Sequence, residues 1–296
     1  LLCLAEKRKM RNNRIKKSAV QIVGLVAIRI IIWLWILSVL FPLVWYLYTS
    51  VKDSFEFAKD YWSFPTYLRF RNYADAFSSK SFPVGEYFFN SLLVTVAGVA
   101  LVEIMVSTTS YAMAKFPFKW LKIVEVFYFA AMMIPSILLI VPLYTQLKSL
   151  SSALINNLFV LAVIYAVQAI PLQIFLVSKF VRGIDKGLME AARIDGANEF
   201  TVFFRVVIPC LKPILFFVGL TATMAFWNEY TIALLFLRKP NFTLSIGLDN
   251  MKYEAMGDYG MIFAGLTIAM LPVLVLYSIF QKFIQNGVDM TEGVKG

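Results

Sequence analysis

Three acids set within long apolar stretches are the residues of this 296-residue chain best placed to do chemistry: Glu103, Glu125 and Glu229. An acid inside a stretch that could span a membrane is a functional candidate, as a proton relay or a substrate contact. The chain has no histidine, which excludes Ser-His-Asp and Cys-His catalysis and histidine-ligated metals. Its two cysteines, Cys3 and Cys210, are too few for a disulfide framework. We therefore predict no catalytic residue and no metal site.

Glu229 has the most informative setting of the three, because aromatic and amide side chains adjoin it. Aromatic faces beside hydrogen-bonding groups suit a sugar, whose C–H face stacks and whose hydroxyls need partners. The alternative is an interface belt with one acid reaching toward water. Glu125 is predicted to be interfacial beside Lys122, whereas Glu103 has no evident cation and is expected to face a wet groove or a partner subunit. The candidate substrate-contact residues are Trp227, Asn228, Glu229 and Tyr230.

A polar loop at 180–212 is the most specific feature of the chain. Asp185 is a good helix N-cap, and Gly196 stands where a helix end favours a residue tolerant of positive φ. The helix between them has little bulk on one face, which leaves room for another protein, or else it rests on lipid headgroups. The candidate docking residues are Glu190, Ala191, Ala192, Asp195, Gly196 and Ala197.

A second short helix is predicted to follow in the same loop. Its apolar residues Phe200, Phe203, Phe204 and Val207 recur at helical spacing. Pro209 is expected to close it, because proline breaks the helical hydrogen-bond ladder. The loop therefore reads as a helix-turn-helix lying under a membrane.

The elements that position these residues are apolar and long. Apolar residues make up 60% of the chain and charged ones 16%, against about 45–50% and about 25% in soluble domains. A spanning helix needs about 20 apolar residues, and six stretches qualify. Prolines within them are expected to bend the helices around a cavity or a rocking joint, or are ordinary membrane-helix prolines. The stretches are 22–48, 88–114, 123–144, 158–180, 213–237 and 261–284, and the prolines are Pro42, Pro135, Pro142, Pro171, Pro213 and Pro272.

The distribution of charge orients these six stretches. The formal net charge is +10, which alone would suit nucleic acid or a membrane surface, but a nucleic-acid binder would not be so apolar. Eighteen Lys and Arg lie in the two termini and the loops at 115–122 and 179–212, against nine in the other loops. The positive-inside rule places the richer side, with both termini, in the cytoplasm. The cations at 7–17 precede an apolar run too long for a signal peptide, so we predict an uncleaved first span.

The loop resembles a known family. Glu190-Ala191-Ala192, three residues and Gly196, followed by Ile208-Pro209, is similar to the EAA loop of binding-protein-dependent ABC importer permeases. Ile208 stands where that pattern usually has leucine. Further stretches resemble the carbohydrate-uptake, MalG-like members, although the tail departs at Asp289-Met290. These stretches are Phe89-Asn90-Ser91-Leu92, 110–116, Met133-Ile134-Pro135, Trp227-Asn228-Glu229-Tyr230 and the tail at 287–296.

The resemblance implies an all-α membrane protein with six transmembrane helices in a MetI-like permease fold. Residues 1–85 would hold the first span and first outer loop, 86–284 the permease core, and 285–296 a cytoplasmic tail. The 190–197 helix would dock on an ABC ATPase, and 227–230 would line the pathway. The loop that reaches the extracytoplasmic binding protein would contribute Asn250, Tyr253, Met256 and Tyr259.

The resemblance also implies the partners: a second, MalF-like permease subunit, the ATPase subunits, the binding protein, membrane lipid and a carbohydrate, with no nucleic acid. The chain has no G-x-x-x-x-G-K-[ST] motif, so ATP and magnesium are expected on the ATPase and no cofactor on this chain. The alternatives are a permease for another solute, such as a polyamine or phosphate, and a proton-coupled transporter with Glu103 and Glu229 as relay acids.

Overall fold

A computed structural model describes residues 19–116, 118–255 and 257–292, with side chains over 23–279 of that part. All of its regular secondary structure within those ranges is helical, which confirms the all-α prediction. Five helices are long and apolar enough to cross a membrane, or six if one bent pair counts as a single span. The cations at 7–17, Cys3, Met256 and residues 293–296 lie outside the described ranges.

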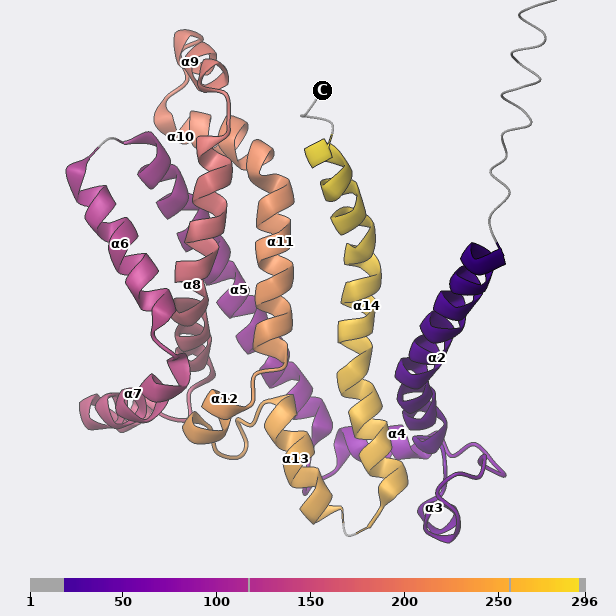
Figure 1. The fold of residues 1–296 in the computed structure, drawn as a ribbon. Coiled ribbons are helices and arrows are strands. Elements are labelled where there is room, and N and C mark those ends of the chain that lie inside the picture. Colours follow the sequence, from indigo (N-terminus) through magenta and orange to yellow (C-terminus); the bar gives the residue numbers. More distant parts are fainter. Residues whose placement is uncertain (1–18, 117, 256, 293–296) are drawn as a thin grey trace, which may run out of the picture.

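Three long helices form the core: α5 (Val84–Lys115), α8 (Leu158–Arg182) and α11 (Ile208–Trp227). They lie against one another (Figure 1). Small residues permit this close approach, since a Cβ at Gly98 would lie 3.0 Å from the ring of Phe226 and 3.4 Å from the Ala162 carbonyl oxygen. In a bilayer, close packing of this kind replaces the hydrophobic drive between helices.

Two further helices form an outer layer beside this core. α14 (Tyr259–Glu292) contacts α11, and α2 (Ala19–Thr49) contacts α14 but lies at the edge of the molecule (Figure 1). Most side chains of α2 are exposed. This helix therefore depends on lipid or another chain to cover its apolar surface.

The third apolar stretch, predicted as a span at 123–144 with prolines inside it, is divided by a sharp bend. It divides into α6 (Lys119–Met133) and α7 (Ser136–Leu150), bent by 100°. Ile134 has the extended backbone typical of a residue before proline, at φ −85° and ψ 117°. Pro135 thus ends one helix, whereas Pro42, Pro142, Pro171, Pro213 and Pro272 all lie inside helices.

The fifth stretch is also shorter at its end than the predicted 213–237. α11 stops at Trp227, and a separate helix α12 (Thr231–Phe236) follows. The break has a local cause: the Glu229 carboxylate accepts hydrogen bonds from the backbone N–H groups of Ile232 (2.8 Å) and Ala233 (3.1 Å). Such an acceptor satisfies the free donors at a new helix start.

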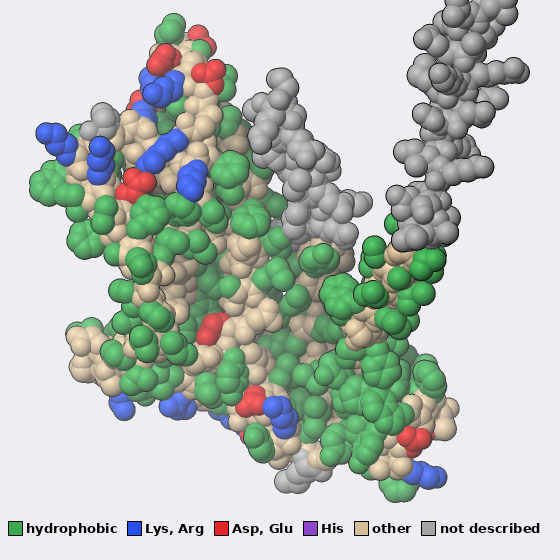
Figure 2. All heavy atoms as spheres, viewed as in Figure 1, with side chains coloured by type: hydrophobic (Ala, Val, Ile, Leu, Met, Phe, Trp, Pro, Cys, Tyr) green, Lys and Arg blue, Asp and Glu red, His purple; other side chains and the backbone are tan. Residues whose placement is uncertain are grey.

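Short helices lie at both ends of the bundle (Figure 1). The α9 end carries α9 (Lys186–Ile194) and α10 (Glu199–Val202). The opposite, α13 end carries α3 (Ser54–Lys59), α4 (Arg71–Ser78), a 3-10 turn (Ser152–Leu154), α12 and α13 (Leu244–Glu254). Figure 2 shows charged side chains gathered at these two ends, with a largely hydrophobic band between them. This is the surface expected of a protein that spans a bilayer.

Candidate functional site

Helix α9 is a short peg whose start and stop are both fixed locally. The Asp185 side chain accepts from the Gly187 N–H at 2.9 Å, confirming the predicted N-cap. At the other end the Gly196 N–H donates to Arg193 and the Ala197 N–H to Ala192, both at 3.0 Å. Gly196 has φ +84°, so the predicted positive φ is confirmed and the end is a Schellman motif.

The docking residues predicted on α9 divide between two environments. Glu190, Ala191, Asp195 and Gly196 are exposed. Ala192 and Ala197 are half-buried and pack against the core. The two alanines of the motif therefore face in different directions, one toward the helix bundle and the other outward.

The second helix of the loop does not stop at Pro209, contrary to the sequence prediction. α10 passes through a π-helical turn (Phe203–Val207) directly into α11. The Ile208 N–H donates to the Phe203 carbonyl, five residues back. A π turn is wider than an α turn, and it lets the chain carry a proline, which has no N–H to donate, without ending.

This turn also changes which aromatic residues are buried. The predicted apolar face grouped four residues at α-helical spacing, but Phe203 and Val207 are buried whereas Phe200 and Phe204 are 76% and 63% exposed. The wider turn rotates the face, so a strict 3.6-residue period fails here.

The four residues 227–230 join five helices toward the α13 end: α8, α11, α12, α13 and α14. Trp227 is buried and donates from Nε1 to the Ala269 carbonyl at 3.2 Å. Glu229 accepts from the Tyr165 hydroxyl at 2.6 Å besides capping α12, and the Tyr230 hydroxyl donates to Asp249 at 2.9 Å. The Asn228 side chain is exposed and donates to the Met224 carbonyl. All four side chains therefore have partners within the chain.

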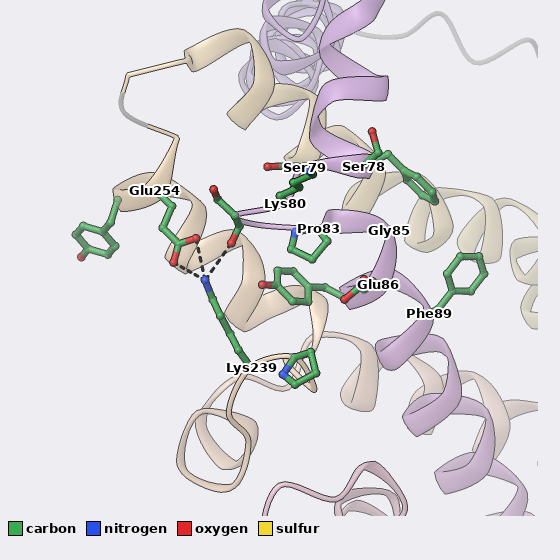
Figure 3. Close-up of a pocket in the computed structure, with 14 residues that line it drawn as sticks. Ser78, Ser79, Lys80, Pro83, Gly85, Glu86, Phe89, Lys239 and Glu254 are labelled. Atoms are coloured by element: carbon green, nitrogen blue, oxygen red, sulfur yellow. Dashed lines mark hydrogen bonds and ion pairs between the residues drawn. The ribbon is translucent and has the colours of Figure 1, made fainter.

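Beside these residues, the 238–260 segment borders a groove of about 1090 Å³ (Figure 3). Lys239 crosses it, donating to Glu254 at 2.6 and 2.9 Å and to the Ser81 carbonyl at 3.0 Å. The groove has aromatic, hydroxyl and charged walls: Phe77, Ser78, Ser79, Lys80, Ser81, Pro83, Gly85, Glu86, Tyr87, Phe89, Lys239, Pro240, Tyr253 and Glu254.

The predicted contact residues of this segment differ in their freedom to meet another protein. Tyr253 lines the groove and is 78% exposed. Asn250 donates to the Ile246 carbonyl within α13, and Tyr259 packs on Phe57 with ring centroids 4.7 Å apart. Near them, hydrogen bonds from Lys252 and Tyr230 hold the pKa of Asp249 below its usual range, so this carboxylate stays charged at neutral pH.

The other two intramembrane acids occupy different settings. Glu125 accepts two hydrogen bonds from Arg182, each 3.0 Å, linking α6 to α8, and it is this arginine rather than Lys122 that partners it. Glu103 is half-buried on α5, with its carboxylate against α11 where Gly219 leaves space. Within the described residues, Glu103 makes no ion pair, and no group of acids and cysteines there could hold a metal ion.

A sequence family described as "Binding-protein-dependent transport system inner membrane component" matches residues 106–290. That stretch is more than half of the chain and contains the α9 peg, its Schellman end and the α10–α11 helix. The chain belongs to this family. It is therefore an ABC transporter permease, a multi-pass component of the bacterial inner membrane, as the resemblance of the 180–212 loop implied.

Curated relatives cover nearly the whole permease. It is 31% identical over 261 residues to the diacetylchitobiose uptake system permease protein NgcG of Streptomyces coelicolor, covering 86% of this chain and 84% of that protein. It is 32% identical over 250 residues to the melibiose/raffinose/stachyose import permease protein MelC of Bacillus subtilis, covering 84% and 88%.

Two solved structures share its fold. A bacterial ABC transporter involved in the import of the acidic polysaccharide alginate matches with a TM-score of 0.78 at 20% identity, over 90% of this chain and 98% of that one. The alginate transporter in complex with an alginate pentasaccharide-bound periplasmic protein matches with a TM-score of 0.62 at 14% identity. The permease thus has the all-helical, MetI-like fold that was predicted.

Sequence reasoning missed a cluster of polar residues between the peg and the core. Glu199, the first residue of α10, meets Arg193 of α9 and both Tyr111 and Lys115 of α5. Nothing in the local pattern marks Glu199, because its partner Tyr111 lies 88 residues away in the sequence.

Proposed function

We propose that this permease forms, with a second permease subunit, the membrane pathway for a sugar or oligosaccharide. An extracytoplasmic binding protein delivers the substrate at the α13 end, and separate ABC ATPase subunits act on α9. The observation that carries the proposal is the α9 peg, locally fixed at both ends and exposed at Glu190, Ala191, Asp195 and Gly196, at the end of the bundle opposite the groove.

The names of the relatives support a carbohydrate as substrate. The two described above are named for diacetylchitobiose and for melibiose, raffinose and stachyose, and a third, AraQ of Bacillus subtilis, for arabinooligosaccharides. These substrates are all glycans of two or more units, which favours an oligosaccharide over a polyamine or phosphate. In this proposal, Asn228 offers its exposed amide to substrate.

The proposed orientation puts six spans across the membrane, with the bent α6–α7 pair as one. The α9 end is cytoplasmic because the cations of the 115–122 and 179–212 loops gather there. The groove then opens to the outside, where Tyr253 and Lys239 are available to a binding protein. ATP and magnesium bind to the ATPase subunits.

The test is reconstitution of the permease in liposomes with its copurifying subunits and binding protein. We expect ATP hydrolysis to rise when the binding protein and one oligosaccharide from a panel are both present. We expect uptake to require ATP in the compartment that the ATPase subunits face. A polyamine or phosphate as the only stimulating solute would overturn the substrate class. Uptake that ignores ATP and collapses with a protonophore would overturn the transporter class.

A further inference from the structure

A single carboxylate ties the α9 peg to the membrane helices. Glu199 accepts from Arg193 Nε at 3.1 Å through Oε1, and from the Tyr111 hydroxyl at 3.0 Å through Oε2. Lys115 forms an ion pair with the same Oε2. Arg193 belongs to α9, whereas Tyr111 and Lys115 lie one turn apart on α5, so the carboxylate joins two separate elements.

The α5 side of this cluster is the more buried one. The Lys115 side chain is only 13% exposed, and its ammonium lies 5.3 Å from the Tyr111 ring centroid and 5.2 Å from that of Phe116. The Glu199 side chain, by contrast, is 49% exposed. Because a buried cation left without its partner is costly, Lys115 favours keeping the Glu199 carboxylate at α5.

The Arg193–Glu199 pair also spans the turn that ends α9. The turn contains Gly196, whose positive φ marks the point where the chain changes direction. Met189 and Ala192 of α9, and Ala197 after its end, also pack against the bundle through apolar contacts. Non-directional packing permits sliding, whereas a charged hydrogen bond fixes direction and distance.

Glu199 also stands at the start of a continuous rod. α10 continues through the π turn into α11, and π turns occur often at functional sites. A cavity of about 210 Å³ lies beside the cluster, lined by Thr108, Tyr111, Phe116, Glu199, Phe200 and Phe203. A displacement of α9 therefore reaches α5 through the carboxylate and α11 through the backbone, with space beside it for the side chains to move.

We infer that Glu199 is a positioning residue that transmits displacement of α9 to α5 and α11, so that ATP hydrolysis in the partner is converted into movement of the spans. The inference rests on the proposed function, in which α9 docks on the ATPase. Without the carboxylate, α9 moves about the Gly196 turn and hydrolysis proceeds with less transport.

The test is Glu199→Gln in the complete transporter, reconstituted in liposomes with binding protein and the stimulating sugar. The measured quantity is ATP hydrolysed per sugar imported. We expect the complex to assemble, and this ratio to rise at least threefold. Glu125→Gln is the matched control, because it breaks another cation–carboxylate pair between two elements, the one that joins α6 to Arg182 at the end of α8, and leaves the contacts of Glu199 intact. The control ratio is expected to stay within about a factor of 1.5 of wild type.

Two further variants separate transmission from simple stabilisation of the fold. Arg193→Gln cuts only the α9 side, so it is expected to raise the ratio as Glu199→Gln does, and the double variant to add nothing further, since coupled residues are not additive. Glu199→Asp keeps the charge and is expected to restore much of the coupling. If Glu199→Gln does not assemble, Arg193→Gln decides in its place.

The outcomes distinguish this inference from the proposed function. A wild-type transporter in which no sugar stimulates ATP hydrolysis overturns the function itself. If the wild type couples normally and Glu199→Gln or Arg193→Gln hydrolyses the same amount of ATP per sugar imported as wild type, only the role of Glu199 is overturned. A rise of the same size in Glu125→Gln overturns it as well, since the effect would then belong to any lost ion pair.

Discussion

Glycines at the α13 end lie where backbone or rigid rings leave no room for a side chain. A Cβ at Gly260 would come within 2.4 Å of both the Lys52 carbonyl oxygen and the Asn72 amide nitrogen. By contrast, a Cβ at Gly219 would meet only the end of the Glu103 side chain, at 2.8 Å. The sequence alone does not distinguish the two glycines, yet only Gly260 lies against backbone.

This contrast predicts different costs for two alanine substitutions. Gly260→Ala is expected to destabilise the permease by about 1–3 kcal/mol, as overpacking does, because the Lys52 backbone cannot move aside. Gly219→Ala is expected to cost much less, since the flexible Glu103 carboxylate can rotate. Thermal unfolding of the two variants in detergent measures this, and equal losses of stability would contradict the steric account.

Lys52 is a fully buried cation that is satisfied without an acid. Its ammonium donates to the Asp60 carbonyl (2.6 Å), the Ser63 carbonyl (2.8 Å) and Ser63 Oγ (2.7 Å). These three acceptors use all three donors of a lysine. The lysine thereby closes the 50–63 segment on itself.

Lys52→Met is expected to destabilise the folded conformation of this segment, because two carbonyl acceptors lose their donor. Each unsatisfied buried group costs about 1–3 kcal/mol. The exposed Lys59 offers the matched control, Lys59→Met. Limited proteolysis followed by mass spectrometry should show faster cleavage within 50–70 for the first variant only. Equal cleavage in both variants would mean that the lysine does not hold the segment.

Two carboxylates in the 50–70 segment make its stability depend on pH. The Phe55 N–H and the Arg69 guanidinium hold the pKa of Asp53 below its usual range, and hydrogen bonds from Thr66 do the same for Glu56. A carboxyl whose pKa is lower folded than unfolded stabilises above its unfolded pKa. That stability is lost as pH falls through the folded value.

We therefore expect the backbone amides of the 50–70 segment to stay protected from hydrogen exchange at neutral pH. Their protection should fall below about pH 4, near the ordinary carboxyl pKa values. Asp53→Asn should lower this amide protection at pH 7, and the protection should then decrease less than in wild type as the pH is lowered. Hydrogen exchange, corrected for intrinsic rates, measures this, with Asp75→Asn in α4 as control. An unchanged acid profile in Asp53→Asn would show that Asp53 does not carry the effect.

At the scale of elements, α9 depends on a single residue that must adopt positive φ. Gly196 has φ +84° and open space around its Cβ position, so only backbone conformation opposes a side chain there. Gly183, at the end of α8, has φ −82°, which any residue adopts. The two positions make a matched pair that separates conformation from crowding.

Gly196→Ala is expected to cost about 1–2 kcal/mol at the turn and to loosen the last turn of α9, with reduced transport per ATP. Gly183→Ala is expected to have little effect on either. Hydrogen exchange of the 191–197 amides and the transport ratio are the measurements. Undiminished protection in Gly196→Ala would contradict the role given to the Schellman end.

For the whole molecule, the separation of charge between the two ends predicts the topology. In a background with Cys3 and Cys210 replaced by serine, Lys80→Cys lies at the α13 end and Lys186→Cys at the α9 end, both at exposed positions. In intact spheroplasts a membrane-impermeant maleimide should label the first and not the second, and both after lysis. The reverse pattern would invert the proposed orientation.

The spans and the peg were predictable because their signals are local. Apolar runs of about 20 residues mark helices that cross a bilayer, and Asp185 and Gly196 mark the bounds of α9 through hydrogen bonds between residues close in the sequence. The prediction that Pro209 ends the second helix of the loop was wrong, because α10 continues through a π turn into α11, which contains Pro209. Pro135, one of the six prolines named in the apolar stretches, falls between α6 and α7, which are bent by 100°.

By itself the sequence determined the class of the protein, its long helices and the α9 peg, since hydropathy, capping and glycine conformation act over a few residues. Only the tertiary structure decided which hydrogen-bond partners the acids have. Glu229 reaches Tyr165, 64 residues away, and Glu199 reaches Tyr111, 88 residues away. Hydrogen bonds act over about 3 Å in space, so partners distant in the chain appear only when the helices are packed together.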